Sequence, residues 1–326
     1  MELCDRRGFV ASLAAIGVAG AARSARGGEA LPLKISPIRE GGVDEVLKVA
    51  HFEIAAGATK PFRILHASDT HLNFWDVTDF CGNEARERHF GMRWVRFPQA
   101  LTSLLATIGY ARERGLPIFH TGDLIDWNTS GNASVCRRTL DGVDLFYALG
   151  NHEYHTSDGK TPALSAEGAR ERVSTFIPND LTVASRVVNG VNFVAFDNGE
   201  LNLREETVVR VKAEFGKGLP VVLLCHIPPT YTPAFLENGL RMKRQILRGQ
   251  GYPEDKLAEL KPGRRIELSY DKRTMGFWDW ARGQKLLKAV LCGHTHVEER
   301  DRFSDTADMY VAGGNYEGFV SEITFT

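Results

Sequence analysis

Five apolar runs in this chain of 326 residues are each followed by residues that can bind a metal ion. The runs have the length of single buried strands, and several give way to a glycine turn. In open α/β sheets, the carboxyl ends of parallel strands meet at one edge, which is where ligands bind. The pattern therefore predicts an α/β fold whose strand ends share one site. The residues at these ends are Asp69 and His71, Asp123, Asn151 and His152, His226, and His294 and His296.

The composition is that of a soluble globular protein with enough residues for one large core or two modest domains. Charged residues make up 25% of the chain, hydrophobic residues make up 43%, and the net charge is −1. This balance argues against nucleic-acid binding driven by bulk charge. Five scattered cysteines indicate neither a disulfide framework nor a zinc ribbon. Two outcomes stay open for Cys81 and Cys136, a disulfide in an oxidising compartment or two free thiols.

Residues 1–30 have the composition of an export signal. Arg6 and Arg7 precede an uncharged run of small residues from Ala11 to Ala22. That run is shorter than the ~20 residues of a membrane helix, and no other segment is apolar enough to span a bilayer. The paired arginines resemble a twin-arginine signal, which implies a bacterial protein exported after folding to the periplasm or outside the cell. A frayed amphipathic terminus is the alternative.

Residues 31–326 are interpreted as one domain in which strands and helices alternate. Strands are expected at 61–67, 116–120, 143–149, 191–196, 219–224 and 286–290, with two edge or hairpin strands within 31–55. Two more, at 309–312 and 319–325, are expected to complete a sheet. Helices are expected near 166–175 and at 100–114, where Leu101, Leu104, Leu105 and Ile108 share one face before Gly115.

Two segments show no clear period and are interpreted as insertions, near 73–98 and 227–285. The second carries 12 Lys or Arg against 7 Asp or Glu, so that its net charge is +5, and it is interpreted as a cap. Away from the strand ends, His66 and His120 lie inside apolar strands and are expected to be core histidines. Cys225 and Cys292 are expected to be small buried hydrophobic residues.

Each polar strand end alone has an ordinary structural explanation, such as a helix cap or a turn. The whole set, in a chain with ten histidines, does not. Together the motifs resemble those of the calcineurin-like metallophosphoesterases. In chain order they are Asp69-Thr70-His71, Gly122-Asp123-Leu124-Ile125-Asp126, Gly150-Asn151-His152-Glu153, His226, and Gly293-His294-Thr295-His296.

This resemblance implies a four-layer αββα sandwich with two central mixed β-sheets. It also implies two divalent or mixed-valence transition-metal ions, of Fe, Mn, Zn or Co. Imidazole, carboxylate and amide donors suit such ions, and no thiolate is required. By the family pattern, Asp69, His71 and His296 would hold one ion, Asn151, His226 and His294 the other, and Asp123 would bridge them.

The function implied is hydrolysis of a phosphomonoester or phosphodiester by a hydroxide that bridges the two ions. His152 would orient the phosphate and protonate the leaving oxygen as general acid. The expected partner is a small-molecule phosphoester, with a nucleotide as one candidate; the sequence does not indicate an oligomeric state. A non-catalytic metal-binding or scaffold protein on the same fold is the alternative, although all seven ligand positions and His152 are present.

Three further assignments stay open, the first from the resemblance and the other two from the residues alone. Purple acid phosphatases, in the same wider family, carry a metal-bound tyrosine where this chain has Asp126, which either orients a ligand histidine or is a turn residue. The cationic run 241–244 either binds a second phosphate or an anionic substrate tail, or is a solvated helix face. Four aromatic residues either stack on a base or aryl group or pack in a core: Phe74, Trp75, Trp278 and Trp280.

Overall fold

The computed structural model describes most of the chain that follows the predicted export signal. The described residues are 46–76, 78–79, 83–155, 165–200, 202–229 and 271–326. The export signal, Cys81 and the cationic run 241–244 lie outside them. Within the described residues, no helix is long and apolar enough to cross a membrane.

The first sheet has five strands in the order β1-β11-β2-β3-β4. Its strands are β1 (Lys48–Ile54), β2 (Phe62–Ala67), β3 (Ile118–His120), β4 (Leu145–Tyr147) and β11 (Phe319–Phe325). Strands β2, β3 and β4 run parallel, whereas β11 pairs antiparallel with β2 and parallel with β1. The sheet is therefore mixed, and its last strand lies between two of the earliest ones.

The second sheet has six strands in the order β5-β6-β7-β8-β10-β9. Its strands are β5 (Val183–Val188), β6 (Val191–Phe196), β7 (Val221–Leu224), β8 (Leu287–Cys292), β9 (Glu299–Arg302) and β10 (Asp308–Val311). The four central strands are parallel, and β5 and β9 pair antiparallel at the two edges. The edge strand β9 has the sequence Glu-Arg-Asp-Arg, and charged side chains of this kind discourage edge-to-edge pairing.

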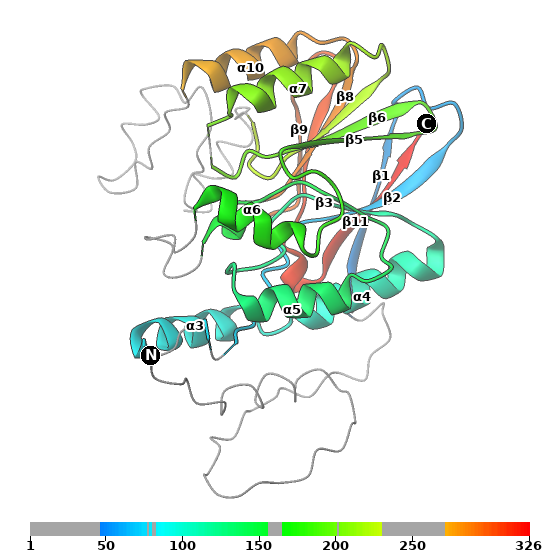
Figure 1. Cartoon of the computed structure of the whole chain (residues 1–326). Helices are drawn as coiled ribbons and strands as arrows, with labels where there is room; N and C mark the ends of the chain where they lie inside the picture. Colours follow the sequence, from blue (N-terminus) through cyan, green and yellow to red (C-terminus); the bar gives the residue numbers. More distant parts are fainter. Residues whose placement is uncertain (1–45, 77, 80–82, 156–164, 201, 230–270) are drawn as a thin grey trace, which may run out of the picture.

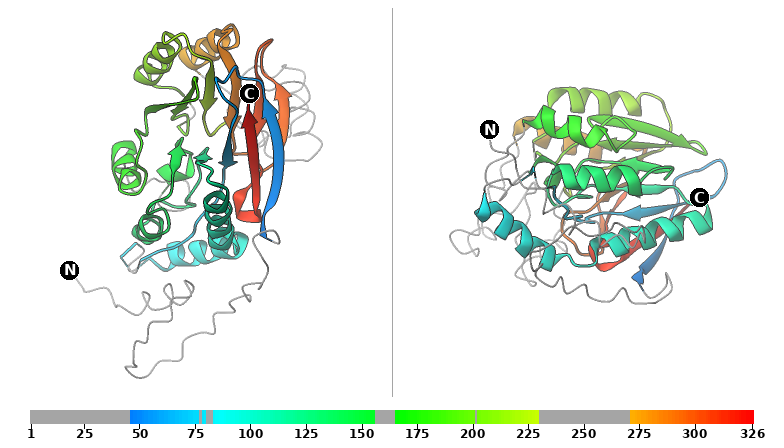
Figure 2. Two further views of the ribbon diagram at one scale, coloured as in Figure 1. Left: turned by 90° about the vertical axis from the view of Figure 1, so that its right-hand side faces the viewer. Right: turned by 60° about the horizontal axis from the view of Figure 1, so that its bottom comes forward.

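Helices cover the outer faces of both sheets (Figures 1 and 2). On the first sheet lie α4 (Ala100–Arg114), α5 (Ser130–Thr139) and α6 (Ala166–Ser174), with α3 (Glu84–Arg96) beside them. On the second sheet lie α7 (Glu205–Phe215) and α10 (Lys272–Arg282). Two short 3₁₀ helices, η3 (His152–Tyr154) and η4 (Asn315–Glu317), follow β4 and β10.

The core between the two sheets is apolar and rich in aromatic side chains. It contains Ile64, Phe119, Phe193, Leu224, Leu291 and Phe325, all less than 2% exposed. Separate apolar cores lie between each sheet and its own helices. The order of layers is helix, sheet, sheet, helix, which confirms the predicted four-layer αββα sandwich.

The loops after the central strands lie against one another. Asp69 N–H donates to Gly122 O and His71 N–H to Asp123 O, each at 2.9 Å. From the other sheet, Gly293 N–H donates to His226 O at 2.9 Å. Within each sheet these bonds join loops that follow different strands. Between the sheets, His294 N–H donates to Asp69 Oδ2 at 2.8 Å, so the carboxyl ends of both sheets form one continuous edge.

Segment 73–98, interpreted from the sequence as an insertion without clear period, contains the regular helix α3. Its ends have ordinary helix signals, since Asn83 caps the helix by accepting from Arg86 N, and Arg93 and Arg96 lie in the last turn. Among its residues only Phe90 is buried. The helix was missed because a single buried residue gives no apolar period.

Two further expectations need correction. Strands β10 and β11 do not complete one sheet, because β10 pairs with β8 and β11 with β1 and β2. On α4, which has the predicted bounds, the buried face runs through Leu104 and Ile108, while Leu105 at its margin is 51% exposed. Its end is as predicted, at Gly115 in a left-handed conformation.

Candidate metal centre

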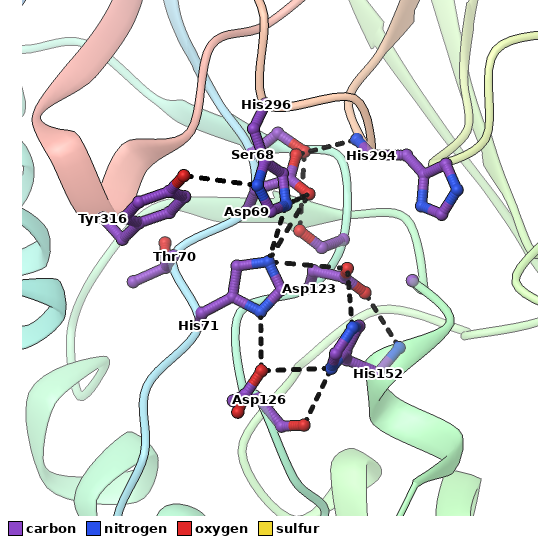
Figure 3. Close-up of polar contacts among 12 residues, drawn as sticks. Ser68, Asp69, Thr70, His71, Asp123, Asp126, His152, His294, His296 and Tyr316 are labelled. Carbon is purple, nitrogen blue, oxygen red and sulfur yellow. Dashed lines mark hydrogen bonds and ion pairs between the residues drawn. The ribbon is translucent and has the colours of Figure 1, made fainter. Parts of the chain in front are cut away.

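Loops that follow β2, β3, β4 and β8 meet at the shared edge and direct their polar side chains toward one another (Figure 3). The loop after β7 brings His226 to the same place. The structure brings together every residue predicted for the site: Asp69, His71, Asp123, Asp126, Asn151, His152, His226, His294 and His296.

The backbone at this edge is held in an unusual conformation. Of the six non-glycine residues with positive φ in the described part of the chain, five belong to the site. They are Asp69 (φ 55°), His71 (53°), Asp123 (53°), His294 (70°) and His296 (59°). A left-handed conformation costs of order 1 kcal/mol for each such residue, and clusters of them mark functional sites. The fold therefore holds these turns against their local preference.

Glycines let the loops approach closely. Gly122 has φ 92°, and a Cβ placed on it would lie 2.7 Å from the Cα of Gly150 on the neighbouring loop. A Cβ on Gly293 would overlap the hydroxyl of Ser68. Any larger residue at either position would separate the loops and the side chains they carry.

The first group of donors, here named the aspartate half-site, consists of Asp69, His71 and His296. Asp69 Oδ1 lies 3.2 Å from His296 Nε2 and 3.7 Å from His71 Nε2, and the two Nε2 atoms are 3.0 Å apart. The outer nitrogens of both rings have other partners. His71 Nδ1 lies 3.1 Å from Asp126 Oδ1, and His296 Nδ1 lies 3.3 Å from the hydroxyl of Tyr316.

This arrangement fits a cation. Asp69 is fully buried, and its Oδ1 atom has no hydrogen-bond partner, although its Oδ2 accepts from His294 N–H at 2.8 Å. A buried carboxylate oxygen without a donor is costly, and so are two imidazole nitrogens that face each other. A metal ion bound by all three atoms would remove both costs at once.

The second group, here named the asparagine half-site, consists of Asn151, His226 and His294. His226 Nε2 lies 3.1 Å from both Asn151 Oδ1 and His294 Nδ1. The outer nitrogen of His226 donates to the backbone oxygen of Thr121 at 2.7 Å. The half-site therefore offers an amide oxygen and two imidazole nitrogens to one point.

Asp123 belongs to both groups. Its Oδ2 atom lies 3.1 Å from His226 Nε2 and 3.8 Å from His71 Nε2. The donor atoms of Asp123, His226 and His294 all lie within 4.8 Å of one another, as do those of Asp69, His71 and His296. Nitrogen and oxygen donors of this kind suit first-row transition-metal ions. The residues present therefore fit two ions that share one carboxylate.

Beside these donors lies His152. Its backbone N–H donates to Asp123 Oδ1 at 2.9 Å, and its ring Nδ1 lies 2.9 Å from Asp126 O and 3.2 Å from Asp126 Oδ1. The other ring nitrogen, Nε2, lies 4.0 Å from Asp123 Oδ2. The side chain is 24% exposed, so part of it is open to solvent.

Charges in the site oppose one another. Burial would raise the pKa of Asp69 and Asp123, but neighbouring imidazoles, of His296 and His226 respectively, hold both pKa values far below the usual range. Burial would lower the pKa of His152, but Asp123 and Asp126 raise it to about 9. Burial and the nearby His226 lower the pKa of His294 to about 3. Ionised carboxylates and a neutral His294 are the forms that bind metal ions.

Four residues that support the site were not singled out from the sequence. Arg93 of α3 binds Asp126, and the Tyr316 hydroxyl lies beside His296. The Glu153 carboxylate, fully buried, accepts from the backbone N–H groups of Asp123, Ile125 and Gly150. Asn198 accepts from His226 N–H and Ile227 N–H at 3.0 Å. Only Glu153 had a sequence signal, because it lies in the Gly150-Asn151-His152-Glu153 motif.

Predicted core histidines and cysteines are placed as expected. The His66 and His120 side chains are buried and bond the hydroxyls of Thr121 and Thr70, and burial lowers their pKa to about 4 and about 3. Both Cys225 and Cys292 are fully buried. Cys136 is a buried free thiol.

The four aromatic residues with two possible roles all pack against other apolar groups. Trp278 is 1% exposed in the core of the second sheet, and the ring centroid of Trp280 lies 4.9 Å from that of Phe215. Phe74 is in the core of the first sheet, and Trp75 packs against Phe90. Core packing therefore accounts for Phe74 and Trp278, whereas Trp75 and Trp280 are partly buried at the margins of their clusters.

Comparison with known proteins gives one family and a set of distant structures. The family model described as calcineurin-like phosphoesterase matches residues 62–298. No curated protein sequence matches the chain. Solved structures that resemble it include a dimetal phosphatase from Danio rerio, with 11% identity, a TM-score of 0.43, and coverage of 78% of this chain and 88% of that one. A 5′-nucleotidase from Candida albicans has 12% identity, a TM-score of 0.35, and coverage of 78% and 45%. A phosphopantetheinyl hydrolase from Mycobacterium tuberculosis has 12% identity, a TM-score of 0.38, and coverage of 78% and 90%.

Proposed function

Because the chain belongs to the calcineurin-like phosphoesterase family, we propose that it hydrolyses phosphoesters with two metal ions bound at this centre. The proposed substrates are small-molecule phosphomonoesters or phosphodiesters, and nucleotides are one candidate. The observation that carries the proposal is the geometry of Asp123. Its carboxylate joins two groups of buried and partly buried donors, and His152 lies beside it with its Nε2 atom 4.0 Å from Asp123 Oδ2.

In this proposal each half-site holds one ion, of Fe, Mn, Zn or Co, and Asp123 is common to both. When bound, such ions act as Lewis acids toward a phosphoryl oxygen and lower the pKa of water. Asp69 and Asp123 bring a charge of −2 against +4 from two divalent ions. The centre therefore keeps a net positive charge in a buried setting, which favours a phosphate anion and the charge that develops on it during reaction.

His152 is proposed to protonate the leaving oxygen. Its Nδ1–H donates to Asp126, both to the backbone oxygen and to the carboxylate. The ring orientation is thereby fixed, and Nε2 is the atom that holds the proton to be transferred. Because the side chain is 24% exposed, a leaving group can reach this nitrogen and solvent can return the proton afterwards.

The function is tested with protein that carries two metal ions per chain, assayed on an aryl phosphate monoester and on a bis-aryl phosphate diester. We expect hydrolysis of at least one, and the ratio of the two rates gives the preference between monoester and diester. Two bound ions with no hydrolysis of either substrate would contradict the proposal and would favour the non-catalytic alternative.

His152→Ala tests the proton transfer. We expect kcat to fall by about 10²–10⁴-fold, the usual contribution of a positioned acid, while both ions stay bound. The ion content is measured by elemental analysis of the same sample. His51→Ala, an exposed histidine of β1, is the control and should keep wild-type activity. Near-wild-type turnover of metal-loaded His152→Ala protein would show that another group supplies the proton.

We also propose export through the twin-arginine route, based on the composition of residues 1–30. A reporter that folds before export, fused after residue 30, should reach the bacterial periplasm. Replacement of Arg6 and Arg7 by lysine should retain it in the cytoplasm. Cytoplasmic retention of the fusion with both arginines intact would contradict the proposal.

A further inference from the structure

Arg93 brings a guanidinium group to the centre from a helix that no motif includes. It lies in the last turn of α3, and its Nε donates to Asp126 Oδ2 at 2.8 Å. Its Nη2 donates to the other carboxylate oxygen, Oδ1. The two groups therefore form a two-pronged ion pair, the geometry in which arginine fixes both the position and the plane of a carboxylate.

Asp126 contacts both a candidate metal ligand, His71, and the proposed general acid, His152. The single atom Oδ1 lies 3.1 Å from His71 Nδ1 in the aspartate half-site and 3.2 Å from His152 Nδ1 (Figure 3). The carboxylate is fully buried. A carboxylate held only by two imidazoles could rotate to favour one of them, whereas the guanidinium prevents that rotation by occupying both oxygens.

The same helix end also contacts His71 directly. Phe97 is the C-cap residue of α3, and its ring stacks on the ring of His71 with centroids 4.6 Å apart and an interplanar angle of 6°. The guanidinium carbon of Arg93 lies 4.9 Å from the centroid of that Phe97 ring. Arg93 and Phe97 are four residues apart and are therefore neighbours at the end of α3. Phe97 packs on the face of the His71 ring, and Arg93 holds the Asp126 carboxylate that contacts its edge.

We propose that Arg93 is a positioning residue that acts through Asp126 and fixes the carboxylate that orients both His71 and His152. The effect of Arg93 on ion binding requires that the centre binds metal ions and does not depend on catalysis. Its effect on turnover rests on the proposed function. The alternative, in which Arg93 binds the substrate itself, predicts a different kinetic signature, since loss of a substrate contact raises KM.

The first experiment measures ion retention in the absence of substrate. Protein loaded with two Mn²⁺ or Co²⁺ ions per chain is challenged with a chelator, and the ions that remain are counted. In Arg93→Gln we expect one ion, that of the aspartate half-site, to be bound about 10–100-fold more weakly, the usual effect of removing a group that orients a ligand. Arg93→Lys keeps the charge without the fork and should lie between Arg93→Gln and wild type.

Arg96→Gln is the matched control. Arg96 is exposed on the same helix and lies over the same Phe97 ring, with its guanidinium carbon 5.4 Å from the centroid. It should retain both ions as wild type does. Wild-type retention in Arg93→Gln, or an equal loss in Arg96→Gln, would overturn the proposal. Since Arg93→Lys keeps the positive charge beside buried Asp126, it decides the question if Arg93→Gln fails to fold.

The second experiment asks whether Arg93 acts through Asp126. In fully loaded enzyme, Arg93→Gln should lower kcat with little change in KM. The double variant with Asp126→Asn should be no worse than Asp126→Asn alone, because residues that act as one unit are not additive. A raised KM, or a double variant weaker than both single ones, would show direct substrate contact instead. If wild type hydrolyses nothing, the proposed function fails and ion retention still tests Arg93.

Discussion

The two half-sites offer similar imidazoles but support them differently. In the aspartate half-site, the outer nitrogens of His71 and His296 meet side chains, the Asp126 carboxylate and the Tyr316 hydroxyl. In the asparagine half-site, His226 donates to the backbone oxygen of Thr121. The ligand that is not a histidine differs as well, a carboxylate from Asp69 in one and an amide from Asn151 in the other.

This difference separates what the fold supplies from what individual residues supply. A backbone oxygen is present whatever side chain the residue carries, so support for His226 follows from the path of the loop after β3. Support for His71 and His296 needs particular side chains, those of Asp126 after β3 and Tyr316 in η4. The aspartate half-site, with its extra negative charge, should bind its ion more tightly, and it should also respond more strongly to substitutions around it.

The largest effect is expected from the residue that both half-sites share. Asp123→Asn keeps the shape but removes the charge between the two ions, so both should bind weakly and kcat should fall about 10³-fold or more, equivalent to about 4 kcal/mol. Ions per chain and kcat are measured together. Asp144→Asn is the control, because that exposed carboxylate pairs with Arg186 away from the centre. Loss of only one ion in Asp123→Asn would show that Asp123 serves a single half-site.

A smaller effect should separate the half-sites. Asp69→Asn gives the aspartate half-site the donor type of its neighbour, so we expect about 100-fold weaker binding of one ion and little change in the other. Asn151→Asp should have the opposite sign and tighten the ion of the asparagine half-site. Stepwise chelation monitored by elemental analysis measures both. Equal loss of the two ions in Asp69→Asn would mean that the half-sites do not bind independently.

The features of the two half-sites that could be predicted from the sequence are those marked by neighbouring residues in the chain. Apolar runs such as 191–196 matched their strands because a fully buried strand needs an unbroken run of such residues. The ligands were predicted because each follows such a run, with glycines marking the turns at positions such as Gly122 and Gly293. These signals require only neighbouring residues, and they predicted the α/β class and the candidate ligands. The four-layer arrangement and the assignment of those ligands to two ions were implied by the resemblance to the family.

The groups that hold those ligands in place could not be predicted in the same way. Arg93 meets Asp126 across 33 residues of sequence, on a helix whose polar surface has no apolar period. Tyr316 reaches His296 from η4, after the chain has passed through β9 and β10. The partner of a charged or aromatic residue can be identified only when the positions of the loops in the folded structure are known. The different sheets of β10 and β11 were missed for the same reason, since pairing is not local.

The smallest effect should come from the weakest of these supports. Tyr316→Phe removes a hydroxyl 3.3 Å from His296 Nδ1, a long hydrogen bond whose net contribution is about 0.5–1.5 kcal/mol. One ion should therefore be retained about 2- to 10-fold less well. Tyr110→Phe is the control. It removes a hydroxyl that donates to Glu322, which is not a residue of the metal centre, and it should leave ion retention unchanged.

Either extreme for Tyr316→Phe would revise the comparison. An effect as large as that of Asp69→Asn would mean that the hydroxyl contacts the ion or the substrate, and not only His296. No effect would mean that ring packing alone holds His296, whose centroid lies 5.2 Å from that of Tyr316. Among the described residues, the aspartate half-site would then depend on a polar side-chain partner at His71 only, and the Arg93–Asp126 pair would be the support that distinguishes it from its neighbour.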